Sequence, residues 1–155
     1  APGFVNTTAH EYHISFAADG REIVFSRSGV GTLVSRWTED GWTVPEVVHL
    51  IDENHLTEES NLTPDGRAIV FCGRADIREP RLLYRAERIE GGWGPPTELF
   101  PGMYATSTLD GSLYYTLEGE GKDYGAIVKR TRSGDAYSEP ALVPGGNKVS
   151  DATLK

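Results

Sequence analysis

The segment Thr63-Pro64-Asp65-Gly66-Arg67-Ala68-Ile69-Val70-Phe71 carries the clearest structural signal in this chain. Its Asp-Gly pair favours a tight turn, because glycine adopts a positive φ at little energetic cost. The apolar run behind the turn combines β-branched and aromatic residues, which fit a pleated, partly buried strand. The segment therefore predicts a β-hairpin with its turn at Asp65-Gly66.

This hairpin signal occurs three times at nearly constant spacing. Asp-Gly pairs are separated by steps of 46 and 45 residues and stand at 19–20, 65–66 and 110–111. A β-type run follows each pair, at 22–26, 68–72 and 112–116. Spacing of this length predicts a repeat protein rather than a single irregular domain.

Two further features recur in each repeat. A second β-type run ends in an arginine, which predicts equivalent positions for Arg36, Arg85 and Arg130. An aromatic residue with a proline three positions later follows, at Trp42, Trp93 and Tyr137. Because aromatic residues contribute strongly to buried cores, we expect these three to pack between repeats.

Each repeat thus contains four short strands: one before the Asp-Gly turn, one after it, one ending in arginine and one after the proline. No segment combines a helical period with helix caps. Four strands in about 45 residues are typical of β-propeller blades. We therefore predict an all-β fold, a β-propeller segment of three four-stranded antiparallel blades. The predicted blades span residues 8–51, 55–101 and 103–145.

The turn segments resemble the Pro-Asp-Gly repeats of TolB-type, WD-repeat-like β-propellers, in which a strand ending in an aromatic residue follows the turn. Thr63 to Phe71 matches this pattern closely. Residues 18–25 lack only the proline, and residues 109–115 lack the proline and one residue after the glycine. The resemblance implies a propeller, and a periplasmic or secreted location in a bacterial assembly. It implies little about activity, because propellers support many unrelated functions.

Both ends of the chain predict incomplete repeats. Residues 1–7 suit the outer strand of a preceding blade, and residues 148–155 suit the inner strand of a following blade. Three blades are fewer than the four to eight of a closed propeller. An open array leaves a blade face and strand edges exposed, which favours association. We therefore expect another copy of the chain to complete a ring, or the chain to be a fragment of a longer propeller.

The composition excludes several classes of partner. The 155 residues carry a formal net charge of −8 and no cluster of lysine and arginine, which argues against nucleic-acid binding. No apolar run approaches the roughly 18 residues of a membrane helix, so we expect no membrane insertion. Cys72 is the single cysteine, and its apolar neighbours predict a buried thiol.

Polar residues of the first strands form the candidate ligand site, because the first strand of a propeller blade lines the central channel. The candidates are His10, Glu11, His13, Glu58, Glu59, Tyr104 and Asp151. His10 and His13 are three residues apart on a predicted strand and point to opposite faces, so we predict no metal site. The chain lacks a nucleophile elbow, a phosphate-binding loop and a Cys-x-x-Cys pair, so we predict no cofactor.

Three functions remain open. The preferred one is a non-catalytic module that binds a protein or a carbohydrate-like ligand, since most carboxylates of an acidic chain only keep its surface soluble. The second is a glycan-active hydrolase or lyase, which needs two carboxyl groups roughly 5–10 Å apart. The third is a purely structural or engineered half-propeller. Convergence of the candidate carboxylates, His10 and Tyr104 in one concave pocket would favour the enzyme.

Overall fold

The computed structural model describes residues 5–52, 55–76, 78–117 and 125–145. These residues form fifteen β-strands and no helix, and so include no helix that could span a membrane. Every strand pair among them is antiparallel. The all-β fold predicted from the sequence is therefore confirmed.

The strands follow one order three times. Unit 1 consists of β1 (Glu11–Phe16), β2 (Glu22–Arg27), β3 (Gly31–Thr38) and β5 (Glu46–Val47). Unit 2 consists of β6 (Leu56–Leu62), β7 (Ala68–Arg74), β8 (Leu82–Ile89) and the first half of β10 (Thr97–Ser107). Unit 3 consists of the second half of β10, β11 (Leu113–Leu117), β12 (Ile127–Arg130) and β15 (Ala141–Leu142). Short strands complete the turns: β4 (Gly41–Trp42), β9 (Gly92–Trp93), β13 (Arg132–Ser133) and β14 (Ala136–Tyr137).

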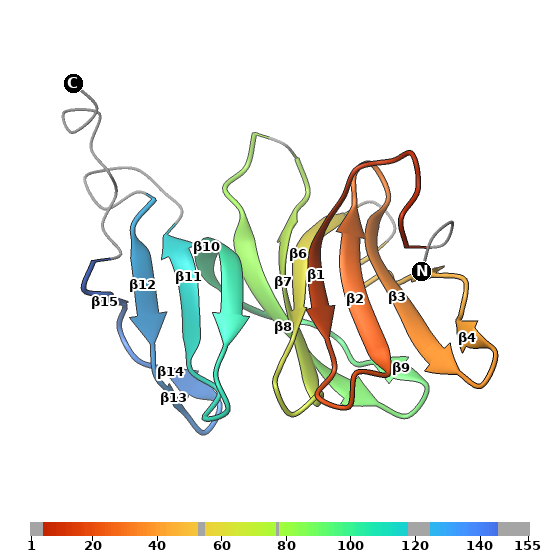
Figure 1. Cartoon of the computed structure of the whole chain (residues 1–155). Coiled ribbons are helices and arrows are strands. Elements are labelled where there is room, and N and C mark those ends of the chain that lie inside the picture. The colour runs from red at the N-terminus through yellow and green to blue at the C-terminus, as the bar shows by residue number, and fades with distance from the viewer. Residues whose placement is uncertain (1–4, 53–54, 77, 118–124, 146–155) are drawn as a thin grey trace.

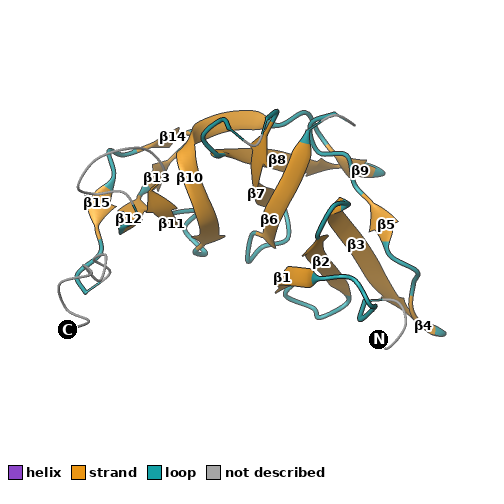
Figure 2. Ribbon diagram, turned by 90° about the horizontal axis from the view of Figure 1, so that it is seen from above, coloured by secondary structure: helices purple, strands orange, loops and turns teal. Residues whose placement is uncertain are grey.

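The three units lie side by side (Figure 1). Seen from above they follow an arc, with β1, β6 and the second half of β10 along its inner side (Figure 2). These three are called the inner strands below. Strand β10 is continuous and pairs with β8 through its first half and with β11 through its second half. The boundary expected at residues 101–103 therefore falls inside one strand that joins units 2 and 3.

The Asp-Gly pairs form the predicted turns between first and second strands. Gly20, Gly66 and Gly111 have φ of 69°, 67° and 79°, the left-handed region that glycine adopts readily. In each turn the aspartate Oδ1 accepts the backbone N–H of the residue two positions later. In the third turn the Thr108 hydroxyl also donates to Asp110, and these hydrogen bonds lower the pKa of Asp110 to about 2. The turns are thus fixed by side chains as well as by glycine.

Apolar side chains fill the contacts between consecutive units, called seams below. In the seam between units 1 and 2, Val24 and Val34 share a core with Leu62, Ile69 and Phe71. The seam between units 2 and 3 contains Val70, Cys72, Leu83, Met103, Ala105, Leu113, Tyr115 and Val128. Cys72 is 1% exposed, so its predicted burial is confirmed.

Two of the three recurring aromatic residues pack between units as predicted. Trp93 lies against the core of the seam between units 1 and 2, and Tyr137 against that of the next seam. Trp42 does not lie between two of the described units: with Val5, it covers Ile23, Phe25 and Leu33 on the face of unit 1 opposite to unit 2. Each aromatic residue thus covers a core at the same place in its unit.

The prediction that the three arginines are equivalent is wrong. In the strand register, Arg36 pairs with Glu22, Arg85 with Val70 and Arg130 with Leu113. The equivalent residues of the second strands are Ile23, Ile69 and Leu113, each paired with the last residue of its inner strand. Relative to these equivalent residues, Arg36 pairs one position earlier, Arg85 one position later and Arg130 at the same position. The connections between the second and third strands differ in length, so distance along the sequence does not fix the register.

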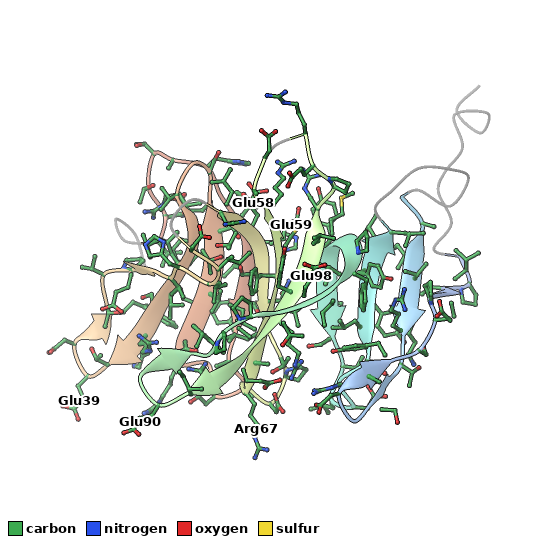
Figure 3. The ribbon with its side chains drawn as sticks, turned by 180° about the vertical axis from the view of Figure 1, so that it is seen from behind. Glu39, Glu58, Glu59, Arg67, Glu90 and Glu98 are labelled. Atoms are coloured by element: carbon green, nitrogen blue, oxygen red, sulfur yellow. The ribbon has the colours of Figure 1, made fainter. Side chains whose placement is uncertain are left out.

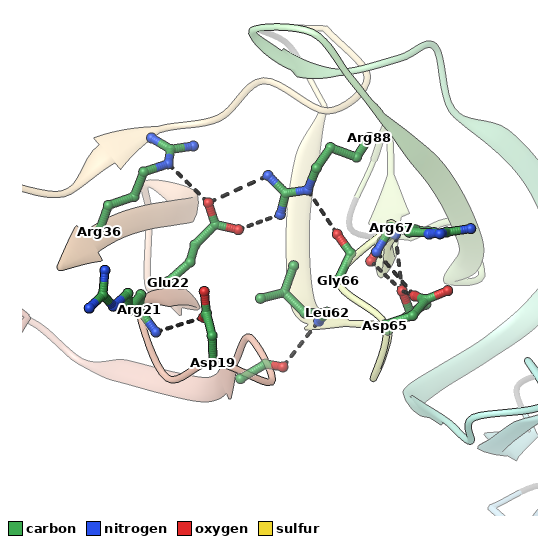
Figure 4. Close-up of polar contacts among 12 residues, drawn as sticks. Asp19, Arg21, Glu22, Arg36, Leu62, Asp65, Gly66, Arg67 and Arg88 are labelled. Carbon is green, nitrogen blue, oxygen red and sulfur yellow. Dashed lines mark hydrogen bonds and ion pairs between the residues drawn. The ribbon is translucent and has the colours of Figure 1, made fainter.

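A network of charged side chains links units 1 and 2 at the end of the units where the Asp-Gly turns lie, called the turn end below (Figure 4). The Glu22 carboxylate is nearly buried and accepts hydrogen bonds from Arg36 of its own unit and from Arg88 of unit 2. Arg88 Nε donates to the Gly66 carbonyl oxygen at 2.8 Å, and its guanidinium lies 4.2 Å from the centroid of the Trp93 ring. Because Arg88 and Glu22 are both occupied by these contacts, we interpret the network as structural.

Candidate functional site

Three residues other than glycine have a positive φ, one in each inner strand of the described chain. His13, Glu59 and Tyr104 have φ of 53°, 55° and 55°. Each lies where the pairing with the second strand shifts register, so all three are at equivalent β-bulges. Such conformations cost about 1–3 kcal/mol each and persist only where the surroundings fix them. The spacing of these residues, 46 and 45, equals that of the Asp-Gly pairs.

The bulges bring side chains of all three units together. The His13 and Tyr104 rings have centroids 5.5 Å apart. Glu59 Oε2 accepts the backbone N–H of Tyr104 at 2.8 Å. Asn61 Nδ2 donates to the Ala105 carbonyl oxygen at 2.9 Å and lies 3.5 Å from His13 Nδ1. His13, Glu59, Asn61 and Tyr104 are called the inner-strand cluster below.

The carboxyl group of Glu59 is the most buried part of this cluster. The residue is 5% exposed, and this burial raises the pKa of its carboxyl group. The Tyr104 N–H and the charges of His13 and Arg81 act in the opposite direction, whereas Glu58 raises the pKa further. The cluster therefore holds a carboxyl group whose charged form is disfavoured.

Glu59→Gln is expected to raise the free energy of unfolding at neutral pH. A glutamine oxygen still accepts the Tyr104 N–H, while the unfavourable buried charge is removed. Since the folded-state pKa lies above the ordinary value of 4.5, the protonated group stabilises the fold at low pH. This contribution is lost as the pH rises through the folded-state pKa. Urea unfolding from about pH 4 to about pH 8 measures it.

The exposed Glu39 provides the control for that experiment, and Glu39→Gln should leave the pH profile unchanged. A Glu59→Gln variant that is less stable than the wild type at neutral pH would show that the charged form is favoured in the fold.

A second polar group lies beside the cluster. The Tyr12 hydroxyl donates to Glu58 Oε1 at 2.9 Å, and burial and this carboxylate raise the pKa of Tyr12. Arg74 lies 4.0 Å from the other oxygen of Glu58. Figure 3 shows Glu58 and Glu59 well away from Arg67, Glu39 and Glu90, which project at the turn end. Glu58 is therefore occupied by a phenol and a guanidinium.

Two of the predicted candidates have local roles at the start of β1. Glu11 forms an ion pair with Arg27 at 2.8 Å and accepts the Thr7 hydroxyl at 2.6 Å. His10 is exposed and stacks on Tyr12, with ring centroids 5.6 Å apart. These contacts place neither residue in the inner-strand cluster.

Of the seven candidates, the structure thus brings His13, Glu59 and Tyr104 together, with Glu58 adjacent. Asp151 lies outside the described residues. Within the described part of the chain, no three His, Cys, Asp or Glu side chains are grouped as metal ligands.

Two contributors were missed from the sequence, Asn61 and Tyr12. Asn61 stands two residues after the bulge residue Glu59, where Ser15 follows His13 in unit 1. Ser15 also links two units, since its Oγ accepts the Leu62 N–H at 3.0 Å. The repeat spacing, extended back from the Asp-Gly pairs to the inner strands, would have identified this linking position.

No family model and no curated protein sequence matches the chain. Among solved structures, it resembles a prolyl endopeptidase, with a TM-score of 0.51 and 18% sequence identity. The match covers 83% of this chain and 20% of that one, so the chain spans about a fifth of that protein. At this identity the likeness concerns the fold alone.

Proposed function

We propose that this chain is a segment of a β-propeller, with units 1 to 3 as three blades, and that it acts as a non-catalytic binding module. Three features support the propeller: the repeated strand order, the arc with its inner strands on one side, and the resemblance of the turns to TolB-type repeats. Another copy of the chain completes the ring.

The inner-strand cluster is the observation that carries the binding function. Tyr104 is 53% exposed although it stands in a strained backbone conformation beside His13. Backbone strain is retained where the surrounding structure over-determines it, and it is frequent at ligand sites. The cluster thus offers an exposed aromatic ring held in place by contacts from two other units.

A carbohydrate-like ligand or a protein segment fits this chemistry. Aromatic faces bind apolar ligand surfaces, while a few fixed polar groups orient hydroxyl or amide groups. Hydrolysis of a glycan is less well supported, because Glu11 is engaged by Arg27, and Glu58 by Tyr12 and Arg74. These internal contacts leave Glu11 and Glu58 poorly suited to act as a catalytic pair.

Calorimetric titration with neutral oligosaccharides (cellotriose and chitotriose) and with a pool of mixed hexapeptides tests this function. Tyr104→Ala is expected to weaken binding about tenfold or more, as removal of an aromatic anchor does. Leu109→Ala, at an 87% exposed position in the third turn, is the control and should bind like the wild type. Failure of every probe to bind, or equal losses in both variants, would contradict the proposal.

Tyr104→Gly should separate stability from binding. Glycine adopts the left-handed conformation freely, whereas alanine retains a steric cost of about 1 kcal/mol or more. Tyr104→Gly is therefore expected to unfold with a free energy about 1 kcal/mol above that of Tyr104→Ala, while both lose ligand binding. Urea unfolding of the two variants measures the difference. An alanine variant as stable as the glycine variant would mean that the bulge relaxes in solution.

A further inference from the structure

In each internal seam, the later unit contributes its inner strand and the earlier unit contributes its second and third strands. These two surfaces are called the docking half and the receiving half below. Leu62 of β6 is 6% exposed and shares a core with Val24 and Val34 of unit 1. Ala105 of β10 is 1% exposed and shares a core with Val70 and Leu83 of unit 2. The inner strand of one unit therefore docks on the second and third strands of the unit before it.

Unit 1 has an exposed docking half. Phe16 and Ile14, which correspond to Leu62 and Ala105, are 56% and 51% exposed. Trp37 corresponds to Arg88, since Trp37 pairs with Trp42 as Arg88 pairs with Trp93. Arg88 binds the preceding unit through Glu22, whereas Trp37 is 48% exposed. The inner and turn-end positions of unit 1 are thus open, although Val5 and Trp42 cover its central face.

Unit 3 has an exposed receiving half. Ile127 corresponds to Leu83 and is 43% exposed, compared with 1% for Leu83. Tyr114 corresponds to Val70 and is half-buried, whereas Val70 is 1% exposed. Thr106 is exposed at the position where Asn61 bonds to the next inner strand. These side chains are positioned to receive a further inner strand.

We propose that copies of this chain dock head to tail, with Ile14, Phe16 and Trp37 of one copy on Thr106, Tyr114 and Ile127 of the next. This inference rests on the proposed propeller segment and names the surface by which its ring is completed. In each internal seam the inner strand presents one apolar side chain, Leu62 or Ala105, and a serine at the other of these two alternate positions. The exposed strand of unit 1 presents apolar side chains at both positions, Ile14 and Phe16, so a second copy is the partner. Such a heterologous contact forms a ring where its rotation closes.

Molar mass by light scattering, over a dilution series, tests the contact with two variants. Phe16→Glu destroys the docking half and Tyr114→Glu the receiving half. The wild type should have a mass of twice 16.9 kDa or a higher multiple, and each variant alone should have a mass of 16.9 kDa. An equimolar mixture should form a heterodimer of twice 16.9 kDa, because one intact docking half meets one intact receiving half. Leu109→Glu, at the 87% exposed turn position, should associate like the wild type.

A monomeric wild type would overturn this inference, as would variants that still associate or a mixture that stays monomeric. If two copies instead associated symmetrically through the same face, mixing the two variants would not restore the association that one of them had lost. Ligand titration of the monomeric variants is independent of this result, since the inner-strand cluster lies within one chain. Loss of association with intact ligand binding would therefore leave the proposed binding function standing and concern the docking surface alone.

Discussion

Phe71→Ala is expected to lower the free energy of unfolding by about 3–5 kcal/mol. Phe71 is fully buried in the seam between units 1 and 2, and its ring stacks on Tyr84 with centroids 5.5 Å apart. Truncation leaves a cavity between two rigid sheets that close it only in part. Because small domains are stable by about 5–15 kcal/mol, the loss is a large fraction of the total. Urea unfolding followed by tryptophan fluorescence measures it.

Phe71→Leu provides the graded comparison, because it retains most of the apolar volume and should cost much less. A loss below about 1 kcal/mol for Phe71→Ala would contradict the seam described above, since truncation of fully buried aromatic side chains costs more.

Gly102→Ala is expected to destabilise the fold by about 1–3 kcal/mol or more, through overpacking. A Cβ atom at this position would lie 2.5 Å from Tyr115 Cδ2 and 3.0 Å from Leu83 Cδ1. Both neighbours are fully buried, so neither side chain can move away at low cost. Gly102 lies within β10, where this strand passes from unit 2 to unit 3. The substitution therefore tests how closely β10 packs at the point where it joins units 2 and 3.

Gly92→Ala is the matched control for Gly102→Ala. A Cβ at residue 92 would meet nothing within 4 Å, and its φ is not in the left-handed region. Thermal or urea unfolding should show little change for Gly92→Ala. Equal effects of the two substitutions would contradict the close packing of Gly102 against Tyr115.

The repeated turns and their strands were predictable because they depend on local chemistry. Asp-Gly favours one turn geometry regardless of its surroundings, and the apolar run after it suits a strand. The burial of the aromatic residues was predictable for a related reason, because one such residue follows a tight turn in each unit and covers a core there. These residues are Trp42, Trp93 and Tyr137.

The strand register was less predictable. Arg36, Arg85 and Arg130 each end a similar run of residues, but loops of different length precede those runs. A shift of one residue moves a side chain to the other face of a sheet, so similar runs can present different side chains. The register is decided by how each strand pairs and packs with its neighbours in the fold, and the residues of a single run do not reveal this.

The candidate site was predicted in part. The repeat spacing placed His13, Glu59 and Tyr104 on the first strands, and the structure brings them together. Their positive φ had no local signal, because none of the three is glycine. The pairing of Glu11 with Arg27 depends on contact between neighbouring strands and was likewise not evident from the sequence.

Amide chemical shifts during a ligand titration test most directly whether the inner-strand cluster is the binding site. The oligosaccharides and peptides named above would be added to the ¹⁵N-labelled chain. We expect the shifts to concentrate at His13, Glu59 and Tyr104 and their strand neighbours, with little change at Gly20 or Gly66 in the turns. Shifts centred on the turn end, or no shift with any probe, would contradict this assignment of the binding site.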